Sequence, residues 1–448
     1  MKRILAGWLM DSCNLNKESK VHIKNWTNNK SQISRGDFIK TLGMGILANS
    51  VILNGCKNND DEKEEISRNG LKAGEIVFAF YPSYYMIYRI SFFATANKIT
   101  IYWGGGQKEV NIAYNGKVFS YEYPRYERRI ITCRTESLKI FRCVPEYDYA
   151  TNDDSYLTEL SFGKCTELTE IKCDNQRITL LDIENTFASL QRLVCSENQL
   201  TSLSVEGAQK LVELKCEKNL LTELNLRGCT ALEQMDCQSN QLTELNLSGC
   251  TALEQVKCNS NQLTKLNLSG CTAMKLLQCD NNKLPALNFS GCTALEQVEC
   301  NSNQLIELNV SGCVAIKSLH CYQNRLQSIN MSGCIALVTL ECTGNWGSNR
   351  ITELNLSGCK ALRLLICEAN LLTRLDLSDC TELKYLFCAE NYLSEIALNA
   401  IFESLPDRTL SDSVGTINFF RNPGTASCDH SIYERKNWEI GYSWGLGL

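Results

Sequence analysis

The feature that most constrains this chain is a segment that returns mostly every 21 residues with a cysteine at the same place. One copy runs Leu253-Glu-Gln-Val256-Lys-Cys258-Asn-Ser-Asn261-Gln-Leu263. A fixed period of this length indicates a solenoid, because one copy is too small to bury its apolar face and must stack on its neighbours. The cysteines that mark the copies are Cys173, Cys195, Cys216, Cys237, Cys258, Cys279, Cys300, Cys321, Cys342, Cys367 and Cys388.

Within each copy the side chains alternate between two directions. Val256 and Cys258 are two residues apart and point inward, whereas the intervening polar residues point outward. A second segment, Leu263-Thr-Lys-Leu266-Asn-Leu268-Ser-Gly-Cys271, repeats the apolar spacing half a coil later. The pattern therefore predicts stacked coils around an apolar interior.

These segments resemble the leucine-rich-repeat consensus LxxLxLxxNxL, with cysteine in the third apolar position. The nested half-repeat is similar to the 21-residue subclass of bacterial surface leucine-rich-repeat lipoproteins, and the similarity covers residues 157–398. The resemblance implies a β-rich solenoid, a right-handed superhelix of eleven coils. We place the repeats at residues 136–398. Segment 417–422 and a short helix over 429–436, which Asp429 caps, resemble the caps of these proteins, so we expect a carboxy-terminal cap at 399–448.

Two columns of identical residues follow from the repeat. A buried Asn stacked on its copies can bond the backbone groups that a turn leaves unpaired, and Gln176 replaces it in the first coil. We expect the repeat cysteines to be free buried thiols, with a disulfide ladder as the alternative and with disulfides near Cys133, Cys143 and Cys428 left open. The Asn column is Asn198, Asn219, Asn240, Asn261, Asn282, Asn303, Asn324, Asn345, Asn370 and Asn391, and the second Cys column is Cys229, Cys250, Cys271, Cys292, Cys313, Cys334, Cys359 and Cys380.

An aromatic segment precedes the repeats. Short alternating runs at 98–103, 118–123 and 130–133 predict β-strands, and three glycines after Trp103 predict a tight turn. This segment resembles a polycystic-kidney-like β-sandwich, placed at residues 73–135, although Tyr102 and Gly105 stand where that family has acids.

The amino terminus has the pattern of an export signal. An apolar run ends in Leu53-Asn54-Gly55-Cys56, which resembles a bacterial lipobox and implies lipidation at Cys56; the alternative is a short buried helix. We therefore expect a signal peptide at 1–55 and an acidic flexible tether at 56–72. The implied location is the outer membrane, surface exposed, with membrane contact only through the lipid anchor.

Charge and motifs limit the classes of function. The net charge is −5 although the first 55 residues are basic, which disfavours a nucleic-acid partner. The sequence contains no GxSxG, HExxH or Walker motif. His320 and His430 lie in repeat or cap positions, and Glu299 and Glu341 occupy outward positions two coils apart. We therefore expect that the protein is not an enzyme and that it binds no cofactor or metal; the alternative is an enzyme.

Apolar residues gather on the outward positions of the last coils. Leu364, Ile366, Tyr385 and Phe387 stand where earlier coils have polar residues, and a four-residue insertion at 346–349 lengthens one coil. Exposed apolar clusters commonly mark contact sites, and the alternative is packing beneath the cap. The sequence thus predicts a cell-surface adhesion scaffold for a protein ligand; a glycan-binding accessory lipoprotein and a structural surface-layer role are alternatives. The predicted ligand-binding residues are Tyr322, Trp346, Ile366, Tyr385, Phe387 and Tyr392.

Overall fold

The computed structural model describes residues 71, 74–81, 88–104, 107–123, 129–135, 137–143, 156–344, 348–410 and 413–442. The chain divides into two compact units, residues 1–66 and 67–448, and all described residues belong to the second. The predicted signal peptide, Cys56 and Trp346 lie outside the described residues.

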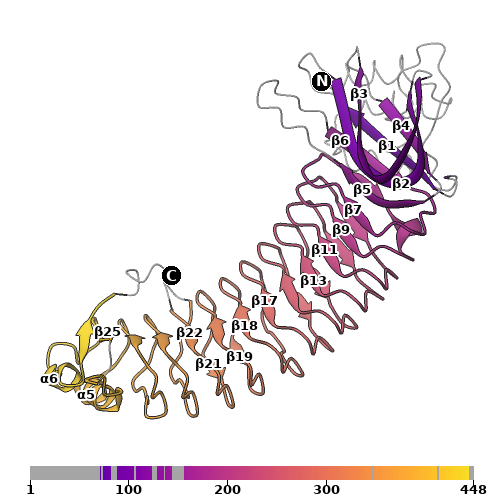
Figure 1. The fold of residues 1–448 in the computed structure, drawn as a ribbon. Helices are drawn as coiled ribbons and strands as arrows, with labels where there is room; N and C mark the ends of the chain where they lie inside the picture. Colours follow the sequence, from indigo (N-terminus) through magenta and orange to yellow (C-terminus); the bar gives the residue numbers. More distant parts are fainter. Residues whose placement is uncertain are drawn as a thin grey trace, which may run out of the picture. The chain divides into compact units, whose positions relative to one another are not determined.

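A parallel ladder of short strands runs through this unit (Figure 1). Eleven of its strands each precede one of the predicted cysteines, so the eleven predicted coils are confirmed. The fold is a leucine-rich-repeat solenoid. The ladder is longer than the repeat predicts, by one strand at the amino-terminal end, where β5 pairs with β7, and by two strands at the carboxy-terminal end, where β25 pairs with β24 and β26 pairs with β25. Its strands are β5 (Leu138–Cys143), β7 (Glu170–Lys172), β9 (Arg192–Val194), β11 (Glu213–Lys215), β13 (Gln234–Asp236), β15 (Gln255–Lys257), β17 (Leu276–Gln278), β18 (Gln297–Glu299), β20 (Ser318–His320), β22 (Thr339–Glu341), β23 (Leu364–Ile366), β24 (Tyr385–Phe387), β25 (Gly415–Asn418) and β26 (Trp438–Ile440).

The opposite side of each coil carries a second, less continuous set of strands. Most of these strands have a buried aliphatic residue at the centre, such as Leu203, between two exposed residues, whereas Leu181 and Leu266 are only partly buried. Their pairing comes in couples, β10 with β12, β14 with β16 and β19 with β21. These strands are β8 (Leu180–Asp182), β10 (Ser202–Ser204), β12 (Glu223–Asn225), β14 (Glu244–Asn246), β16 (Lys265–Asn267), β19 (Glu307–Asn309) and β21 (Ser328–Asn330), and a 3-10 turn, η1 (Glu184–Thr186), follows β8.

The Asn column closes the turns after the ladder strands from β9 to β25, and Gln176 does so after β7. Asn261 Nδ2 donates to the carbonyl oxygens of Cys237 (3.0 Å) and Cys258 (3.2 Å), and its Oδ1 accepts from the Leu242 N–H at 3.0 Å. Gln176 supplies the same acceptor to Leu157 at 3.0 Å. Similar bonds recur at Asn198, Asn219, Asn240, Asn282, Asn303, Asn324, Asn370 and Asn391, as predicted, and also at Asn422.

The prediction is wrong for one member of the Asn column. Asn349, and not Asn345, makes the ladder bonds, to the carbonyl of Cys321 at 2.9 Å and from the Leu326 N–H at 3.0 Å. The four extra residues therefore lie between Cys342 and Asn349 rather than at 346–349, because the amide that reaches the buried turn fixes the register. Asn345 lies outside the described residues.

Six strands precede or begin the solenoid, and the predicted strands at 98–103, 118–123 and 130–133 lie within β2, β3 and β4. The longest pair, β2 with β3, is antiparallel, and β4 bridges β2 to β1. β5 and β6 then pair in parallel with β7 and β8, so both sides of the first coil continue strands of this module. Besides β5, the strands are β1 (Glu75–Tyr81), β2 (Tyr88–Gly104), β3 (Gln107–Tyr123), β4 (Arg129–Thr135) and β6 (Tyr156–Phe162).

The carboxy-terminal end covers the last coil. α5 (Glu395–Ser404) begins within the predicted repeat range and buries Leu398, Ile401 and Phe402, and the Phe402 ring lies 5.1 Å from that of Tyr433. The short helix predicted at 429–436 is α6 (Ser431–Glu434), and the Asp429 carboxylate accepts from the Ser431 N–H at 3.0 Å. In the described part of the chain, no helix is both long and apolar enough to cross a membrane.

Candidate functional site

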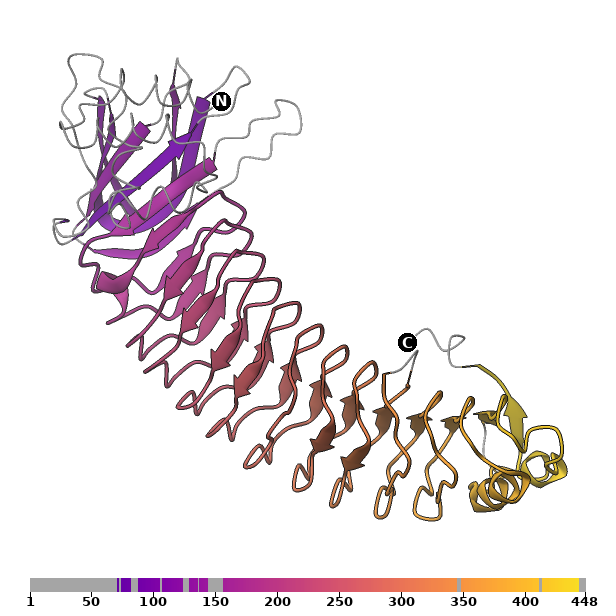
Figure 2. The same ribbon diagram turned by 180° about the vertical axis from the view of Figure 1, so that it is seen from behind.

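The outward side chains of the ladder strands, with the residue after each cysteine, form one continuous surface, which we call the strand face. Each ladder strand from β7 to β24 turns its central residue inward, and the residues on either side of it point outward, as in Gln255-Val256-Lys257. Neighbouring strands pair in register, so outward residues line up in columns across the coils. Figure 2 shows these strands side by side along one wall of the stack.

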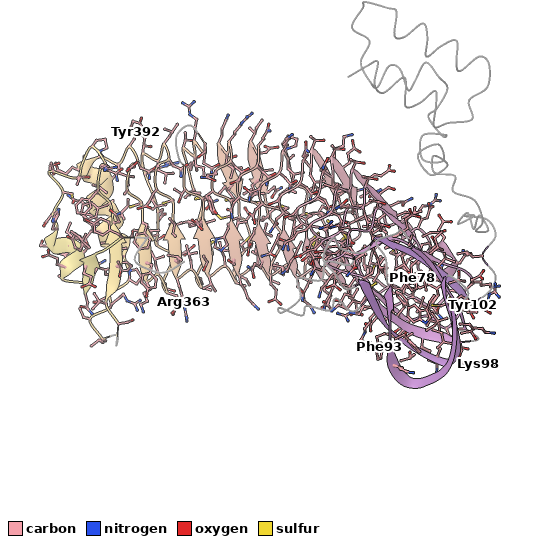
Figure 3. All side chains as sticks on the ribbon, turned by 90° about the horizontal axis from the view of Figure 1, so that it is seen from above. Phe78, Phe93, Lys98, Tyr102, Arg363 and Tyr392 are labelled. Atoms are coloured by element: carbon pink, nitrogen blue, oxygen red, sulfur yellow. The ribbon has the colours of Figure 1, made fainter. Side chains whose placement is uncertain are left out.

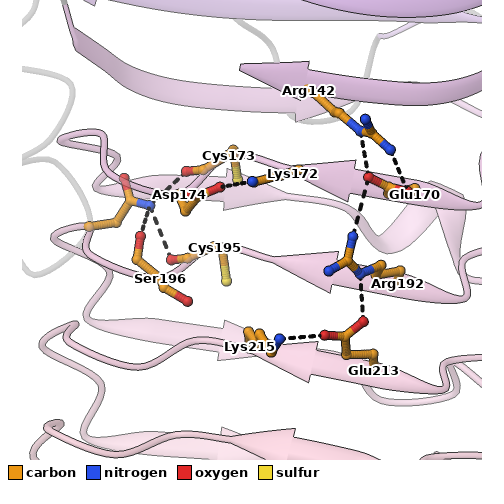
Figure 4. A network of polar contacts seen from close by, with 11 residues as sticks. Arg142, Glu170, Lys172, Cys173, Asp174, Arg192, Cys195, Ser196, Glu213 and Lys215 are labelled. Atoms are coloured by element: carbon orange, nitrogen blue, oxygen red, sulfur yellow. Dashed lines mark hydrogen bonds and ion pairs between the residues drawn. The ribbon is translucent and has the colours of Figure 1, made fainter. Parts of the chain in front are cut away.

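Near its amino-terminal end the strand face is a network of alternating charges (Figure 4). Arg142 donates to both carboxylate oxygens of Glu170, at 2.6 and 3.1 Å. Arg192 lies between Glu170 (3.7 Å) and Glu213 (2.5 Å), and Lys215 Nζ lies 2.8 Å from Glu213. Because Arg142, Glu170, Arg192 and Glu213 alternate in sign on four successive strands, this part holds β5, β7, β9 and β11 together and offers a partner little unpaired charge.

The middle of the strand face has a different electrostatic character. From β17 to β22 its outward positions carry the carboxylates Asp280, Glu299 and Glu341 and no Lys or Arg. Glu299 accepts from the side-chain amides of Gln278 at 2.8 Å and Gln297 at 2.6 Å. These carboxylates are bonded by neutral amides or by an imidazole, so this zone keeps an acidic surface.

His320 lies at the centre of this acidic zone. Glu299, His320 and Glu341 are aligned on three consecutive strands. The imidazole Nδ1 lies 2.9 Å from Glu341 Oε2, and Nε2 lies 2.8 Å from Ser318 Oγ. The hydrogen bond to Glu341 raises the pKa of His320 above its ordinary value, and the charges of Glu299 and Asp280 act in the same direction.

The residue after each cysteine adds a second set of bonds between coils. Asn259 Oδ1 accepts from the Asp280 N–H, and Asp280 Oδ1 accepts from the Asn301 N–H at 2.7 Å. Asn301 Oδ1 in turn accepts from the Tyr322 N–H at 3.0 Å. Burial raises the pKa of Asp280 and of Tyr322. The chain of bonds fixes the backbone of Tyr322, a predicted binding residue, beside His320.

The apolar end of the strand face differs from the exposed patch that the sequence predicts. Ile366 is 6% exposed and Phe387 is 0% exposed, and with Leu364 they form a small buried cluster against which Tyr385 packs. Ile366 and Phe387 therefore do not present their side chains to solvent and are not part of an exposed patch. Tyr385 is half-buried and stays accessible.

The remaining predicted site residues lie apart from this cluster. Tyr392 is 59% exposed and stands on an edge of the solenoid, opposite the edge that carries Arg363 (Figure 3). Tyr322 follows β20, three coil steps from Tyr385, so the structure brings together only Ile366, Tyr385 and Phe387. Trp346 lies outside the described residues.

The cysteines do not form a ligand site on this surface. All 23 described cysteines are buried free thiols, including Cys133, Cys143 and Cys428. Burial raises the pKa of these thiols, to about 11 for Cys165 and about 12 for Cys229. Among the described residues, no group of three or more His, Cys, Asp or Glu side chains is arranged to hold a metal ion.

Sequence reasoning missed the contact between Ser318 and His320. The two residues are separated by one position in a strand that alternates, so their side chains lie on one side. That alternation was a usable signal, but it does not show which imidazole nitrogen faces the hydroxyl or that Glu341 holds the other.

Comparison with known proteins finds leucine-rich-repeat structures. The functional domain of InlJ from Listeria monocytogenes, described as including a cysteine ladder, is 28% identical over 58% of this chain and 66% of its own, with a TM-score of 0.39. The leucine-rich-repeat protein LIC12759 of Leptospira interrogans is 20% identical over 62% and 79%, with a TM-score of 0.45. YopM from Yersinia enterocolitica is 20% identical over 58% and 62%, with a TM-score of 0.39. No family model and no curated protein matches the chain.

Proposed function

We propose that this protein is a binding scaffold that holds a protein partner on the strand face between β17 and β24. The observation that carries the proposal is the change along this face from paired charges, through carboxylates without Lys or Arg, to the half-buried ring of Tyr385. A partner of complementary chemistry presents Lys or Arg side chains to Glu299 and Glu341 and an apolar group toward Tyr385. Such complementarity selects the partner and speeds the encounter.

The accessible aromatic residues favour a protein over a glycan. Sugar binding uses aromatic rings that lie close together beneath the ligand. Tyr322 and Tyr385 belong to coils three steps apart, about 14 Å at the usual strand spacing. Tyr392 stands on the edge of the solenoid. This spacing suits scattered contacts with a protein surface.

Arrays of extracellular-matrix proteins and glycans test the proposal with the purified chain. We expect binding to protein spots that weakens with salt, and a loss of about tenfold or more in Glu299→Lys, since charge reversal places like charges in contact. Tyr322→Ala and Tyr385→Ala should weaken binding with little change in the unfolding midpoint. Phe387→Ala should instead lower that midpoint, because its ring is buried.

The matched control is Glu223→Lys, which reverses an exposed charge on β12, on the other side of the coils. It should bind as the parent protein does. Binding only to glycan spots, or equal loss in Glu223→Lys and Glu299→Lys, would contradict the proposal.

We also propose that the chain is exported and anchored by a lipid on Cys56 as a surface-exposed outer-membrane lipoprotein. The support is the apolar run that ends in Leu53-Asn54-Gly55-Cys56, followed by acidic residues. Cells that express the protein should incorporate a palmitate analogue into it, and Cys56→Ala should abolish the label. Equal labelling of the two proteins would count against the anchor.

A further inference from the structure

Three side chains at the centre of the strand face are connected in one line. Ser318 Oγ lies 2.8 Å from His320 Nε2, and His320 Nδ1 lies 2.9 Å from Glu341 Oε2. Ser318 and His320 stand on the same side of β20, and Glu341 stands beside His320 on β22. A hydroxyl, an imidazole and a carboxylate in this order are the parts of an activated nucleophile, which is recognised by geometry and not by sequence order.

The carboxylate determines which nitrogen of His320 carries the proton. An ionised carboxylate only accepts hydrogen bonds, so Nδ1 carries the hydrogen that faces Glu341. In the neutral imidazole Nε2 then has a free lone pair, and Ser318 Oγ donates to it. This is the tautomer that a general base needs in order to take a proton from serine.

The neighbouring strands place polar side chains on both sides of Ser318. Gln297 on β18 and Thr339 on β22 are its register partners. One N–H of the Gln297 carboxamide is donated to Glu299, so its second N–H and the Thr339 hydroxyl are the donors that can stabilise an oxyanion formed beside the serine. Ser318, Gln297 and Thr339 are all half-exposed, so an acyl donor reaches them from solvent.

We propose that Ser318 is a nucleophile that accepts an acyl group from carboxylic esters with good leaving groups, with His320 as its base and Glu341 as the positioning residue. Ser318 Oγ bonds to the carbonyl carbon while its proton passes to His320 Nε2. The bond from that carbon to the leaving oxygen then breaks, and the leaving alkoxide takes the proton from Nε2. A water molecule then loses a proton to the same nitrogen and bonds to the acyl carbon, the bond from that carbon to Ser318 Oγ breaks, and Oγ takes the proton from Nε2 as the acid is released. This activity goes beyond the proposed binding function.

The charges around His320 set the pH dependence. The hydrogen bond and charge of Glu341 on β22, with the charges of Glu299 on β18 and Asp280 in the turn after β17, raise the pKa of the imidazole against the lowering effect of its burial. Tyr322, in the turn after β20, is the other titratable residue beside His320. The base form is the neutral imidazole, so acylation should accelerate as pH rises through this raised pKa and then level off.

Labelling of the full chain with a fluorophosphonate probe tests the proposal. Attack by Ser318 Oγ forms a bond to phosphorus and expels fluoride, and mass spectrometry of the peptide that contains Ser318 locates the label. We expect a rate that rises with pH to a plateau, and hydrolysis of p-nitrophenyl acetate with the same profile. Ser318→Ala should abolish the label, and His320→Gln should slow it by at least about tenfold.

Two further variants separate chemistry from packing. Glu341→Gln removes the charge that raises the pKa of His320, so the midpoint of the pH profile should move to lower pH, which a loss of packing does not produce. Ser302→Ala removes a nearby hydroxyl that bonds Gln323 at 2.7 Å and should leave the labelling unchanged. An unlabelled Ser318 in the parent protein, or the same rate and flat pH profile in His320→Gln, would overturn the proposal. Neither result bears on the array experiment, whose readout is binding.

Discussion

At the scale of single residues, the buried Asn column holds each turn to the next. Asn261→Ala removes three donated bonds and the acceptor of the Leu242 N–H, and leaves buried backbone groups without partners. We expect a loss of about 2–4 kcal/mol in the free energy of unfolding, measured with urea.

An exposed asparagine of the same repeat provides the control. Asn246 lies on β14, where its Oδ1 accepts only the Ser248 N–H (3.1 Å) and the Asn267 amide (3.0 Å), both in contact with water. Asn246→Ala should cost less than about 1 kcal/mol. Similar losses in the two variants would mean that the column does not stabilise the coils as its bonds suggest.

The same residues show what can and cannot be predicted from the sequence. A residue type that recurs at a fixed spacing reports its surroundings, so the Asn and Cys columns could be predicted, including the replacement by Gln176. His320 occurs once in its column, and a single occurrence carries no periodic signal. Its contacts with Ser318 and Glu341 depend on side-chain rotamers, which the repeat does not specify.

At the scale of strands and helices, the ladder strands could be predicted because two constraints coincide, alternation within a strand and the period between coils. The coil that contains the four-residue insertion shows where such prediction stops. From the sequence, either Asn345 or Asn349 could belong to the Asn column. The structure identifies Asn349, because its side chain donates to the buried carbonyl of Cys321. α5 was missed because its first residues, Glu395–Leu398, continue the repeat spacing before Ile401 and Phe402 pack against the cap.

The prediction that the apolar end of the strand face is exposed is wrong for a related reason. Ile366 and Phe387 occupy outward positions, and alternation alone predicts exposure for such positions. Their burial depends on packing between the side chains of β23 and β24, namely Leu364, Ile366, Tyr385 and Phe387. The pattern of a single strand thus predicts which way each side chain points. Whether that side chain is exposed depends also on the segments that pack against it.

At the scale of the whole molecule, the buried thiols connect stability to pH. Burial raises the pKa of each repeat thiol in the folded state, for example to about 12 for Cys271 and Cys334. In the unfolded chain a thiol has a pKa of about 8.5. The stabilisation is therefore fully present below about pH 8.5 and is lost as pH rises toward the folded value, because the unfolded state releases protons first.

Because the repeat columns hold many such thiols, their effects add, and we expect the urea midpoint to fall steeply between about pH 8.5 and 10. Each thiol contributes a slope of about 1.4 kcal/mol per pH unit above its unfolded pKa. Cys258→Ala, which removes one 0%-exposed thiol, should reduce the total slope by that amount while leaving a small cavity. Alkylation should agree, with most repeat thiols reacting only after unfolding. A midpoint that stays constant across this range, or native thiols that react as fast as a free cysteine, would show that the columns are not held as buried, protonated groups.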